Sequence, residues 1–480
     1  MEIPPRGAAT KPRSSLPDAP SEPLPRRSLF EPALGAVLAV AAAAVALTCA
    51  GSGAVARTPV KKPAARASVV ERPAGKPAKS SPAVPSAERA VAPAPSGSVH
   101  AELAPHRAVE LSRFFAALDA LARRERSESV HVLWFGDSHT AADYYTGAVR
   151  QALARHYGSG GPGFVRVGLA SYRHDLATLN RVGHFRIEPD PPSRRMLQDD
   201  GVFGLGGIRV APVAPPARLT LKVAPRALGG YAKFRVLFEL PPGSAFSLTA
   251  GDQSLEVADA SRAEHVAGSP ILRVELSAEP SSMLSIEVKK GRPRFYGVVV
   301  EGTEPGLVLD TLGIDGARVA TALAWAEEPF VAEVAARRPE LVVLAYGTNE
   351  AFDELNVEAY DRQVTDFLGR LRRGAPAADC LVVGPPDALG TNGETAPRVV
   401  SISAVYARVA ARLGCAFVSA QALMGGPGGF AAWLREDPPL ARPDRLHLSP
   451  RGYRRLGELL AASVLGEAPA APVPADKNSP

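Results

Sequence analysis

The chain has 480 residues, of which 46% are hydrophobic, and a formal net charge of +6. This length and composition allow two to three globular domains with sizeable cores. The positive charge belongs to the first hundred residues, which carry a balance of +7, whereas the remainder carries −1. A nucleic-acid-binding domain would place its basic excess on a folded face, so nucleic acid is not expected as a partner.

An apolar segment lies near the N-terminus. Residues 32–56 contain no charged side chain, and they exceed the roughly 20 residues that a helix needs to cross the hydrocarbon core of a bilayer. Arg26 and Arg27 precede the segment, as in a start-transfer sequence. We therefore predict a cytoplasmic or signal n-region over 1–31 and an uncleaved transmembrane signal anchor over 32–56.

The apolar segment also sets the expected location of the protein. A signal anchor would hold the chain in the inner membrane and place its bulk outside the cytoplasm, in the cell envelope. Two alternatives stay open. Cleavage after Ala54-Val55-Ala56 would give a secreted protein, and Cys49 could carry a lipid.

Residues 57–105 are predicted to form a linker. They are rich in Pro, Ala, Lys and Ser and show no apolar periodicity, which argues against a packed core. Pro-rich chain favours the extended polyproline II conformation, so this segment is interpreted as a semi-rigid spacer. Residues 467–480 are interpreted as a C-terminal tail.

The folded region opens as an α/β unit. Apolar spacing predicts a helix over Leu111–Arg124, and Val130–Phe135 is a short apolar run typical of a buried strand. A second helix is predicted over Asp143–Tyr157. The order of helix, strand, sharp turn and helix indicates a parallel sheet.

The pattern changes to an all-β one over 166–304. Short strand-like runs are separated by Gly, Pro, Asn or Asp, and no long amphipathic helix is present. We interpret this region as an inserted β-sandwich domain. Its predicted strands are Leu219–Val223, Tyr231–Leu240, Phe246–Ala250, Ile271–Leu276, Met283–Val288 and Phe295–Glu301.

The α/β pattern then resumes, so the α/β domain is expected to comprise 106–165 and 305–466. The predicted strands of its second part are Leu307–Leu312, Leu341–Ala345, Cys380–Val383 and Ala416–Ser419. The predicted helices are Arg318–Ala335, Val357–Arg373, Arg398–Leu413 and Gly452–Leu465. Strands that alternate with helices predict a parallel sheet covered on both faces.

A Gly136-Asp137-Ser138-His139 sequence directly follows the first strand and precedes a helix. A serine in this place is presented at the carboxyl edge of the sheet, where open α/β sheets bind ligands. The positive end of the next helix favours negative charge that develops there. Asp137 and Ser138 are also residues that cap helices, so the sequence alone has a purely structural explanation.

Two further turns follow predicted strands. Gly316 stands before a helix and can offer an unobstructed backbone N–H, and Asn349, after Gly347, is a neutral side-chain donor of the kind that an oxyanion needs. Near the C-terminus, Asp444 and His447 are three residues apart on a turn. This spacing lets a carboxylate orient an imidazole that takes a proton from a serine.

The ordered set of these motifs resembles the SGNH (GDSL-like) hydrolase family. Gly136-Asp137-Ser138 resembles its first block, Gly316 the glycine of its second, and Asn349 the asparagine of its third; Asp444 and His447 resemble its last. The resemblance is closest to peptidoglycan O-acetylesterase-like members, which share the GDSH opening, the inserted β-domain and a third block like Ala345–Glu350. One departure is Thr311, where the family often has asparagine.

The resemblance implies an SGNH/flavodoxin-like three-layer fold and an extracytoplasmic serine esterase. Ser138 would be the nucleophile, His447 its general base and Asp444 the residue that orients His447. The backbone N–H groups of Ser138 and Gly316 and the Asn349 amide would form the oxyanion hole.

The expected partner is an acylated polysaccharide or peptidoglycan, together with the membrane through the N-terminal segment. No metal and no other cofactor is expected, because the histidines show no ligand spacing. The alternatives are an O-acetyltransferase that uses the same residues and a non-catalytic wall-binding or polysaccharide-binding protein. Cys380 begins one predicted strand and Cys415 precedes the next, and either a disulfide or two buried thiols would fit.

Overall fold

The computed structural model describes residues 109–467, except Ser171, Gln198 and Ser281. The predicted n-region, signal anchor and linker therefore lie outside the described residues, as does nearly all of the predicted tail. Within the described part of the chain, no helix is both long and apolar enough to cross a membrane.

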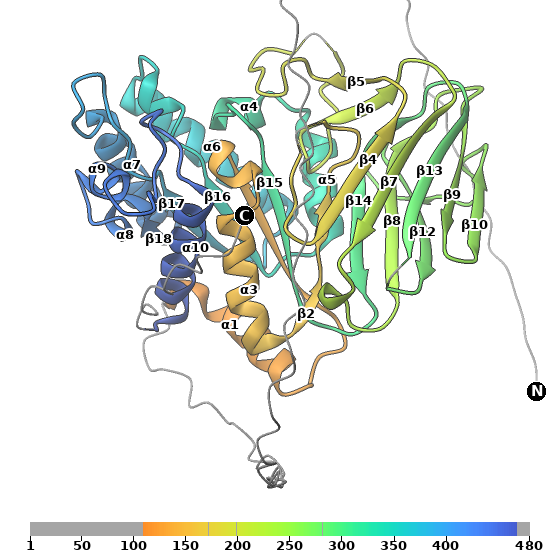
Figure 1. Ribbon diagram of the computed structural model, residues 1–480, viewed down its shortest axis with the longest axis horizontal. Helices are drawn as coiled ribbons and strands as arrows, with labels where there is room; N and C mark the ends of the chain where they lie inside the picture. Colours follow the sequence, from red (N-terminus) through yellow and green to blue (C-terminus); the bar gives the residue numbers. More distant parts are fainter. Residues whose placement is uncertain (1–108, 171, 198, 281, 468–480) are drawn as a thin grey trace, which may run out of the picture. The chain divides into compact units, whose positions relative to one another are not determined.

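A parallel sheet of six strands forms the centre of the α/β part, in the order β18-β17-β16-β1-β15-β2 (Figure 1). Its strands are β1 (Val130–Gly136), β2 (Ser159–Gly161), β15 (Leu307–Gly313), β16 (Leu341–Ala345), β17 (Asp379–Gly384) and β18 (Ala416–Ser419). All but β2 were expected from their apolar runs. The structure confirms the mixed α/β class and the parallel sheet.

Helices cover both faces of this sheet. Successive side chains of a buried strand point to opposite sides, so each face of the sheet presents an apolar surface that a helix layer can bury. On one face, Trp134 packs against Tyr145, with ring centroids 5.5 Å apart. On the other face, Phe135 packs against Phe330 and Phe367, both at 5.7 Å. The first face carries α1 (Ser112–Ala122), α3 (Tyr145–Tyr157) and α10 (Pro450–Leu465), and the second carries α5 (Glu327–Arg337), α6 (Val357–Gly374) and α7 (Pro397–Leu413).

The prediction of one continuous helix over Arg318–Ala335 is wrong. The structure has two helices, α4 (Val319–Leu323) and α5, joined by a short turn. Pro329 lies in the first turn of α5; it has no backbone N–H, and its ring clashes with a preceding helical turn. The turn is fixed by Ala326, whose N–H donates to the carbonyl of Gly201 over 2.9 Å.

The middle of the chain forms two antiparallel sheets. The five-stranded sheet has the order β10-β9-β13-β7-β4, and the larger sheet has the order β11-β12-β8-β14-β6-β5, with β3 also paired to β14. The strands are β3 (Gly163–Val165), β4 (Ala177–Val182), β5 (Phe185–Glu188), β6 (Arg209–Pro212), β7 (Ala217–Val223), β8 (Ala232–Glu239), β9 (Ala245–Ala250), β10 (Gln253–Val257), β11 (Glu264–His265), β12 (Leu272–Ala278), β13 (Met283–Lys290) and β14 (Arg294–Gly302).

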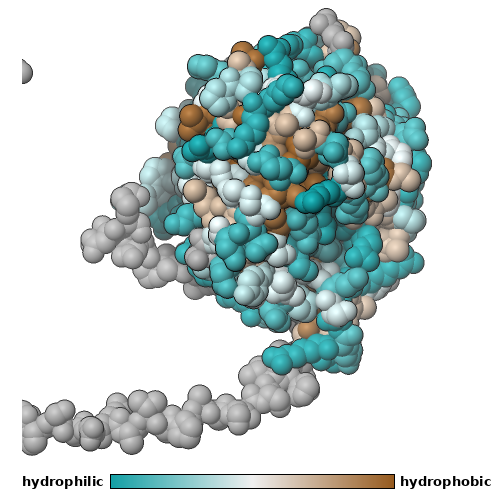
Figure 2. Space-filling view, turned by 90° about the vertical axis from the view of Figure 1, so that its right-hand side faces the viewer, coloured by the Kyte–Doolittle hydropathy of each residue, from teal (hydrophilic) through white to brown (hydrophobic). Residues whose placement is uncertain are grey.

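The two antiparallel sheets pack face to face. Phe246 of the smaller sheet lies between Phe238 and Phe295 of the larger, at centroid distances of 4.9 and 5.2 Å. This core is continuous with the one that lies under α5, α6 and α7. Viewed from the side of β9 and β10, the surface is mainly hydrophilic around a small apolar area (Figure 2). The inserted strands are thus packed onto the α/β part through a shared core.

A buried ion-pair network joins the two parts of the fold. Asp310, inside β15, accepts hydrogen bonds from the backbone N–H of Phe164 at 2.8 Å and from the Arg337 guanidinium at 2.7 and 3.0 Å. Arg337 also lies 2.7 Å from Glu301 of β14. Removal of one member would leave an uncompensated buried charge, so the network specifies how the sheets meet.

A disulfide joins Cys380, in β17, to Cys415, which directly precedes β18. The sequence left open whether these residues are bridged or reduced, and the structure pairs them. The bridge links two neighbouring strands of the parallel sheet.

Candidate active site

Ser138 lies at the sharp turn between β1 and the short helix α2 (Ser138–Ala141). A Cβ at Gly136 would lie 2.1 Å from Thr140 Oγ1 and 2.8 Å from the carbonyl oxygen of Ala345, so the turn requires glycine. Asp137 caps α2 by accepting the N–H of His139 over 3.0 Å. The helix-capping explanation therefore holds for Asp137, whereas the hydroxyl of Ser138 contacts His447.

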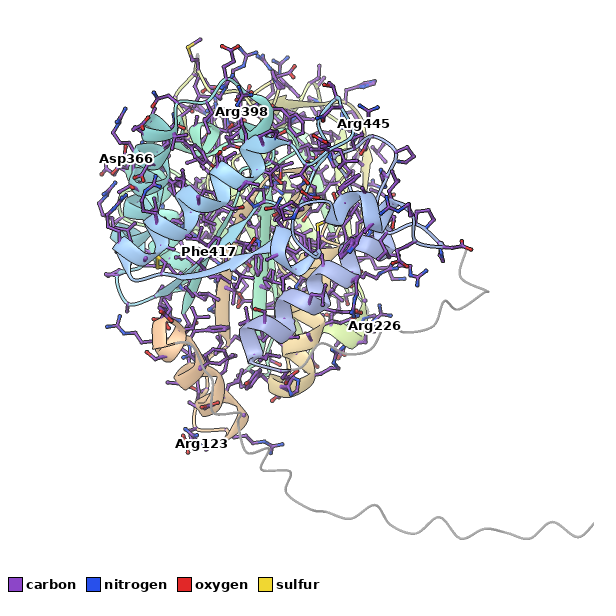
Figure 3. The ribbon with its side chains drawn as sticks, turned by 90° about the vertical axis from the view of Figure 1, so that its left-hand side faces the viewer. Arg123, Arg226, Asp366, Arg398, Phe417 and Arg445 are labelled. Atoms are coloured by element: carbon purple, nitrogen blue, oxygen red, sulfur yellow. A yellow bond between two sulfur atoms is a disulfide. The ribbon has the colours of Figure 1, made fainter. Side chains whose placement is uncertain are left out.

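Asp444 and His447 lie on the loop before α10. One carboxylate oxygen of Asp444 accepts the backbone N–H groups of Leu446 at 3.0 Å and His447 at 2.8 Å. Figure 3 shows Arg445, which lies between these two residues in the chain, at the same end of the domain as Arg398 of α7. This loop therefore reaches the end of the domain where α7 begins.

The structure brings Ser138, His447 and Asp444 into contact, although Ser138 and His447 are 309 residues apart in the chain. Ser138 Oγ lies 3.0 Å from His447 Nε2, and His447 Nδ1 lies 3.1 Å from Asp444 Oδ2. Partial burial opposes ionisation of Asp444, but the hydrogen bonds from His447 and Leu446 outweigh it and lower the pKa of this carboxyl. An ionised carboxylate therefore faces the imidazole.

The second and third blocks also meet. Gly316 follows β15 with a φ of 73°, a conformation that favours glycine. The Asn349 amide donates to the carbonyl of Ala317, the next residue, over 2.9 Å. Arg318 donates to the carbonyl of Gly316 at 3.0 Å and pairs with Asp353 at 2.6 Å. Sequence reasoning missed Arg318 and Asp353, because their pairing depends on long-range packing.

Glu350 is a second residue that the motifs did not single out. Its buried carboxyl group accepts the N–H of Gly347 at 3.2 Å and that of Val319, the first residue of α4, at 2.9 Å. Burial raises the pKa of Glu350 to about 7. Glu350 thus holds the turn after β16 against the helix that follows Gly316.

Asp137 connects the third block to Ser138. The residue is buried, with 1% of its surface exposed, and its Oδ2 accepts the N–H of Thr348 at 3.3 Å. Burial raises the pKa of Asp137 to about 6, although the hydrogen bonds from His139 and Thr348 act in the opposite direction. The residue before Ser138 is thereby tied to the residue before Asn349.

His139 packs beside the candidate catalytic imidazole. Its ring centroid lies 5.6 Å from that of His447, and its Nδ1 lies 2.9 Å from the Tyr453 hydroxyl. Burial, followed by the charge of His447, lowers the pKa of His139 to about 3. His139 is therefore neutral at neutral pH and adds no positive charge next to His447.

Thr311 belongs to a buried polar cluster under the site. Its hydroxyl donates to Asp143 at 2.7 Å and accepts from Arg150 at 2.9 Å, and Arg150 pairs with Asp143 at 3.0 Å. The cluster fixes β15 against α3. Among residues 109–467 with their three gaps, no group of His, Cys, Asp and Glu is arranged to hold a metal ion.

Residues 289–455 match the GDSL-like lipase/acylhydrolase family. The chain carries an SGNH hydrolase domain. This match includes Gly316, Asn349, Asp444 and His447. Ser138 lies before the matched residues, and the fold brings it into contact with His447. The chain is accordingly a serine hydrolase of the SGNH type. A search among curated proteins finds no match to it.

One solved structure shares the fold of this SGNH hydrolase, and others are similar to parts of the chain at lower TM-scores. A structure titled "Peptidoglycan O-acetylesterase in action, 5 min" is 24% identical, with a TM-score of 0.61, and the alignment covers 73% of this chain and 95% of the other. A lipase/acylhydrolase from Enterococcus faecalis is 20% identical over 35% of this chain and 80% of the other, with a TM-score of 0.27. A family two carbohydrate esterase from Clostridium thermocellum is 11% identical over 60% and 98%, with a TM-score of 0.25.

Proposed function

We propose that this SGNH hydrolase removes short acyl groups, acetyl in particular, from the hydroxyl groups of a carbohydrate. The observation that carries the proposal is the continuous contact from Ser138 Oγ through the His447 imidazole to the Asp444 carboxylate, with distances of 3.0 and 3.1 Å. This is the arrangement by which an imidazole activates a serine hydroxyl.

In the first half of the reaction, Ser138 Oγ attacks the ester carbonyl while His447 Nε2 takes its proton. The lowered pKa of Asp444 keeps its carboxylate ionised, so it stabilises the imidazolium that forms. His447 then gives the proton to the departing sugar oxygen, and the acyl group remains on Ser138. In the second half, His447 takes a proton from water, which attacks the acyl-serine and releases the acid.

The negative charge on the carbonyl oxygen needs donors in both halves of the reaction. We assign this role to the backbone N–H groups of Ser138 and Gly316 and to the Asn349 amide. The links from Asp137 to Thr348 and from Asn349 to Ala317 support the assignment, because they connect the three turns that carry these donors. Donors held in place before reaction stabilise such a charge most effectively.

The substrate class is supported by the fold shared with the structure titled as a peptidoglycan O-acetylesterase, which extends over the inserted strands. O-acetylated peptidoglycan is thus the first polymer to test. We propose that 166–304 is a β-sandwich that borders the substrate, inserted between the two parts of the hydrolase domain, 106–165 and 305–466.

We further propose that the hydrolase lies outside the cytoplasm, held by the segment 32–56 and spaced from the bilayer by 57–105. The Cys380–Cys415 disulfide supports this location, because disulfides persist mainly in oxidising compartments. Fractionation of cells that express the full chain, compared with a chain that lacks residues 1–56, tests the proposal. The full chain should sediment with membranes and be degraded by protease added to spheroplasts.

The esterase proposal is tested by hydrolysis of p-nitrophenyl acetate and by release of acetate from O-acetylated peptidoglycan. Wild-type protein should act on both, and a fluorophosphonate probe should label Ser138 and no other residue. Ser138→Ala should be folded, inactive and unlabelled. An inactive, unlabelled wild type would favour a carbohydrate-binding protein, whereas acetylation of an added sugar faster than hydrolysis would favour an O-acetyltransferase.

A further inference from the structure

A cavity of about 340 Å³ lies beside the candidate active site. Its wall includes Ala141 and Ala142, at the end of the helix that begins with Ser138, and Gly313, Ile314 and Asp315, which directly precede Gly316. Ser193 also lines the cavity, and its Oγ would lie 3.4 Å from a Cβ placed on Gly316. The cavity is therefore positioned to hold the part of a substrate next to the reacting ester.

Arg166 lines this cavity from the inserted region, just after β3. The side chain is buried, with the residue only 3% exposed. Its Nε and Nη2 donate to the carbonyl of Gly206 at 3.3 and 2.8 Å, and the guanidinium lies 5.9 Å from the centroid of Tyr172. Among the described residues, its Nη1 has no hydrogen-bond partner, and no carboxylate lies within the 4.0 Å of an ion pair.

The lack of a carboxylate partner distinguishes Arg166 from the other buried arginines of the described residues. Each has a carboxylate within ion-pair distance: Arg150 with Asp143 at 3.0 Å, Arg209 with Asp200 at 2.7 Å, Arg273 with Glu333 at 2.6 Å and Arg337 with Asp310 at 2.7 Å. A buried cation without a counter-charge is costly. Burial accordingly lowers the pKa of Arg166, whereas the pKa of Arg337 is raised because the nearby carboxylates outweigh its burial.

None of the other described polar groups of the cavity forms an ion pair with this guanidinium. Arg173 is occupied by Asp175 at 2.9 Å and by the carbonyl of Ala142 at 2.9 Å. Asp315 lines the cavity and its charge favours the protonated Arg166, but burial outweighs this effect, and the exposed Asp315 makes no ion pair with Arg166. Tyr172 adds an aromatic ring. One unpaired guanidinium beside an aromatic ring matches a sugar that carries a carboxylate, because guanidinium binds carboxylates through charge-assisted hydrogen bonds.

We propose that this cavity binds the carboxylate of an acidic sugar residue through Arg166, so that the substrate is an O-acylated acidic carbohydrate. The inference rests on the proposed function only for the placement of the ester at Ser138. The anion site itself is carried by the cavity and by the unpaired Arg166, and it can be tested by binding alone.

The binding test uses the full chain and isothermal titration with glucuronate and galacturonate. Glucose and galactose are the neutral controls, and sulfate is the control for an unspecific anion. The uronates should bind, and Arg166→Gln should weaken them by about 10- to 100-fold, as expected for hydrogen bonds to a charged group. Arg166→Lys should retain part of the affinity, while Arg235→Gln, at an exposed ion pair of β8, should bind as wild type does.

Equal binding of sulfate and uronates, or unchanged uronate binding by Arg166→Gln, would overturn the inference. If Arg166→Gln fails to fold, the proposal is tested by the selectivity of the wild type for uronates over neutral sugars and by the affinity of Arg166→Lys for uronates. A wild type that does not prefer uronates would then overturn it. Thermal unfolding in the presence of uronate gives an independent readout, because a bound ligand raises Tm.

The kinetic test separates this inference from the proposed function. Wild-type kcat/KM should be about 10-fold or more higher for an O-acetylated methyl glucuronide than for the matching glucoside, mainly through KM. The ratio should fall toward one in Arg166→Gln. Hydrolysis of both sugars at equal rates, without uronate binding, would remove the acidic-sugar site and leave the esterase. Uronate binding without hydrolysis of any ester would support the acidic-sugar site and overturn the proposed esterase function.

Discussion

The backbone N–H of Thr348 donates a 3.3 Å hydrogen bond to the buried carboxyl group of Asp137, the residue before Ser138. This contact joins the turn of the nucleophile to the turn that carries Asn349, and the same carboxyl group caps α2 through His139. Asp137 is therefore expected to position the site without touching the substrate.

Asp137→Ala should remove both contacts. Loss of a helix cap costs about 1 kcal/mol, so Tm should fall by a few degrees, while kcat should fall by about 10-fold or more as the donors lose their alignment. Asp137→Asn keeps an acceptor and should recover most of kcat. Steady-state kinetics on p-nitrophenyl acetate and thermal unfolding measure both effects, and a stability loss without a change in kcat would contradict the positioning role.

Asp444→Asn tests the relay directly. The amide cannot stabilise the imidazolium of His447, so kcat should fall by roughly 100-fold or more, with a smaller effect on KM. Asp444 is partly exposed, so the variant should keep its fold. Ser138→Ala provides the fully inactive reference, and an Asp444→Asn enzyme with wild-type turnover would show that another residue supports His447.

Asn349→Ala tests the proposed oxyanion donor. Removal of one such donor typically lowers kcat by about 100- to 1000-fold, and KM should change little because the donor acts mainly in the transition state. Asn392→Ala, in an exposed turn, is a suitable control for expression and handling. A variant that changes KM instead of kcat would place Asn349 in substrate binding.

The strands that sequence reasoning missed are mainly those at the edges of the sheets. β4 and β10 are the edges of the five-stranded sheet, and β5 and β11 are the edges of the larger one. Edge strands bury fewer side chains, and β4 (ATLNRV) is exposed along most of its length, so its apolar pattern is weak. Central strands such as β16 (LVVLA) are buried throughout and stand out as apolar runs.

Some residues of the site could likewise be predicted from local sequence, and others could not. Ser138, Gly316 and Asn349 each lie in the turn after a strand, so the sequence alone predicts that they share one edge of a parallel sheet. The Asp353 partner of Arg318 and the missing counter-charge of Arg166 depend instead on which surfaces pack together. No local pattern predicts such contacts, because they join segments far apart in the chain.

Glu350 should make the stability of the protein depend on pH. Burial raises its pKa to about 7 from 4.5, so between these values the folded state keeps a proton that the unfolded chain has lost. Stability therefore falls as pH rises through this window, and the full shift corresponds to about 3 kcal/mol. Glu350→Gln cannot ionise, so its Tm should decline less than that of wild type between pH 5 and pH 7.

The comparison must be made between the two proteins, because other groups titrate in the same range. The pKa of Asp137 is raised to about 6 and acts in the same direction, whereas the pKa of His139 is lowered to about 3 and stabilises the fold as pH rises. Both groups titrate in both proteins, so the difference reports on Glu350 together with its coupling to Asp137, whose charge also raises the pKa of Glu350. Parallel Tm curves for wild type and Glu350→Gln would show that this carboxyl group does not titrate as inferred.

The disulfide should contribute measurably to stability through the unfolded state. Cys380 and Cys415 are 35 residues apart, and closing a loop of this length corresponds to about 4 kcal/mol in the chain-entropy model. The double variant Cys380→Ala/Cys415→Ala should therefore unfold at lower denaturant concentration than the oxidised wild type. A reductant should lower the wild-type midpoint toward that of the double variant and leave the variant unchanged. If oxidised and reduced wild type unfold together, the two cysteines are not bridged in the folded protein, and the support for an extracytoplasmic location is lost with them.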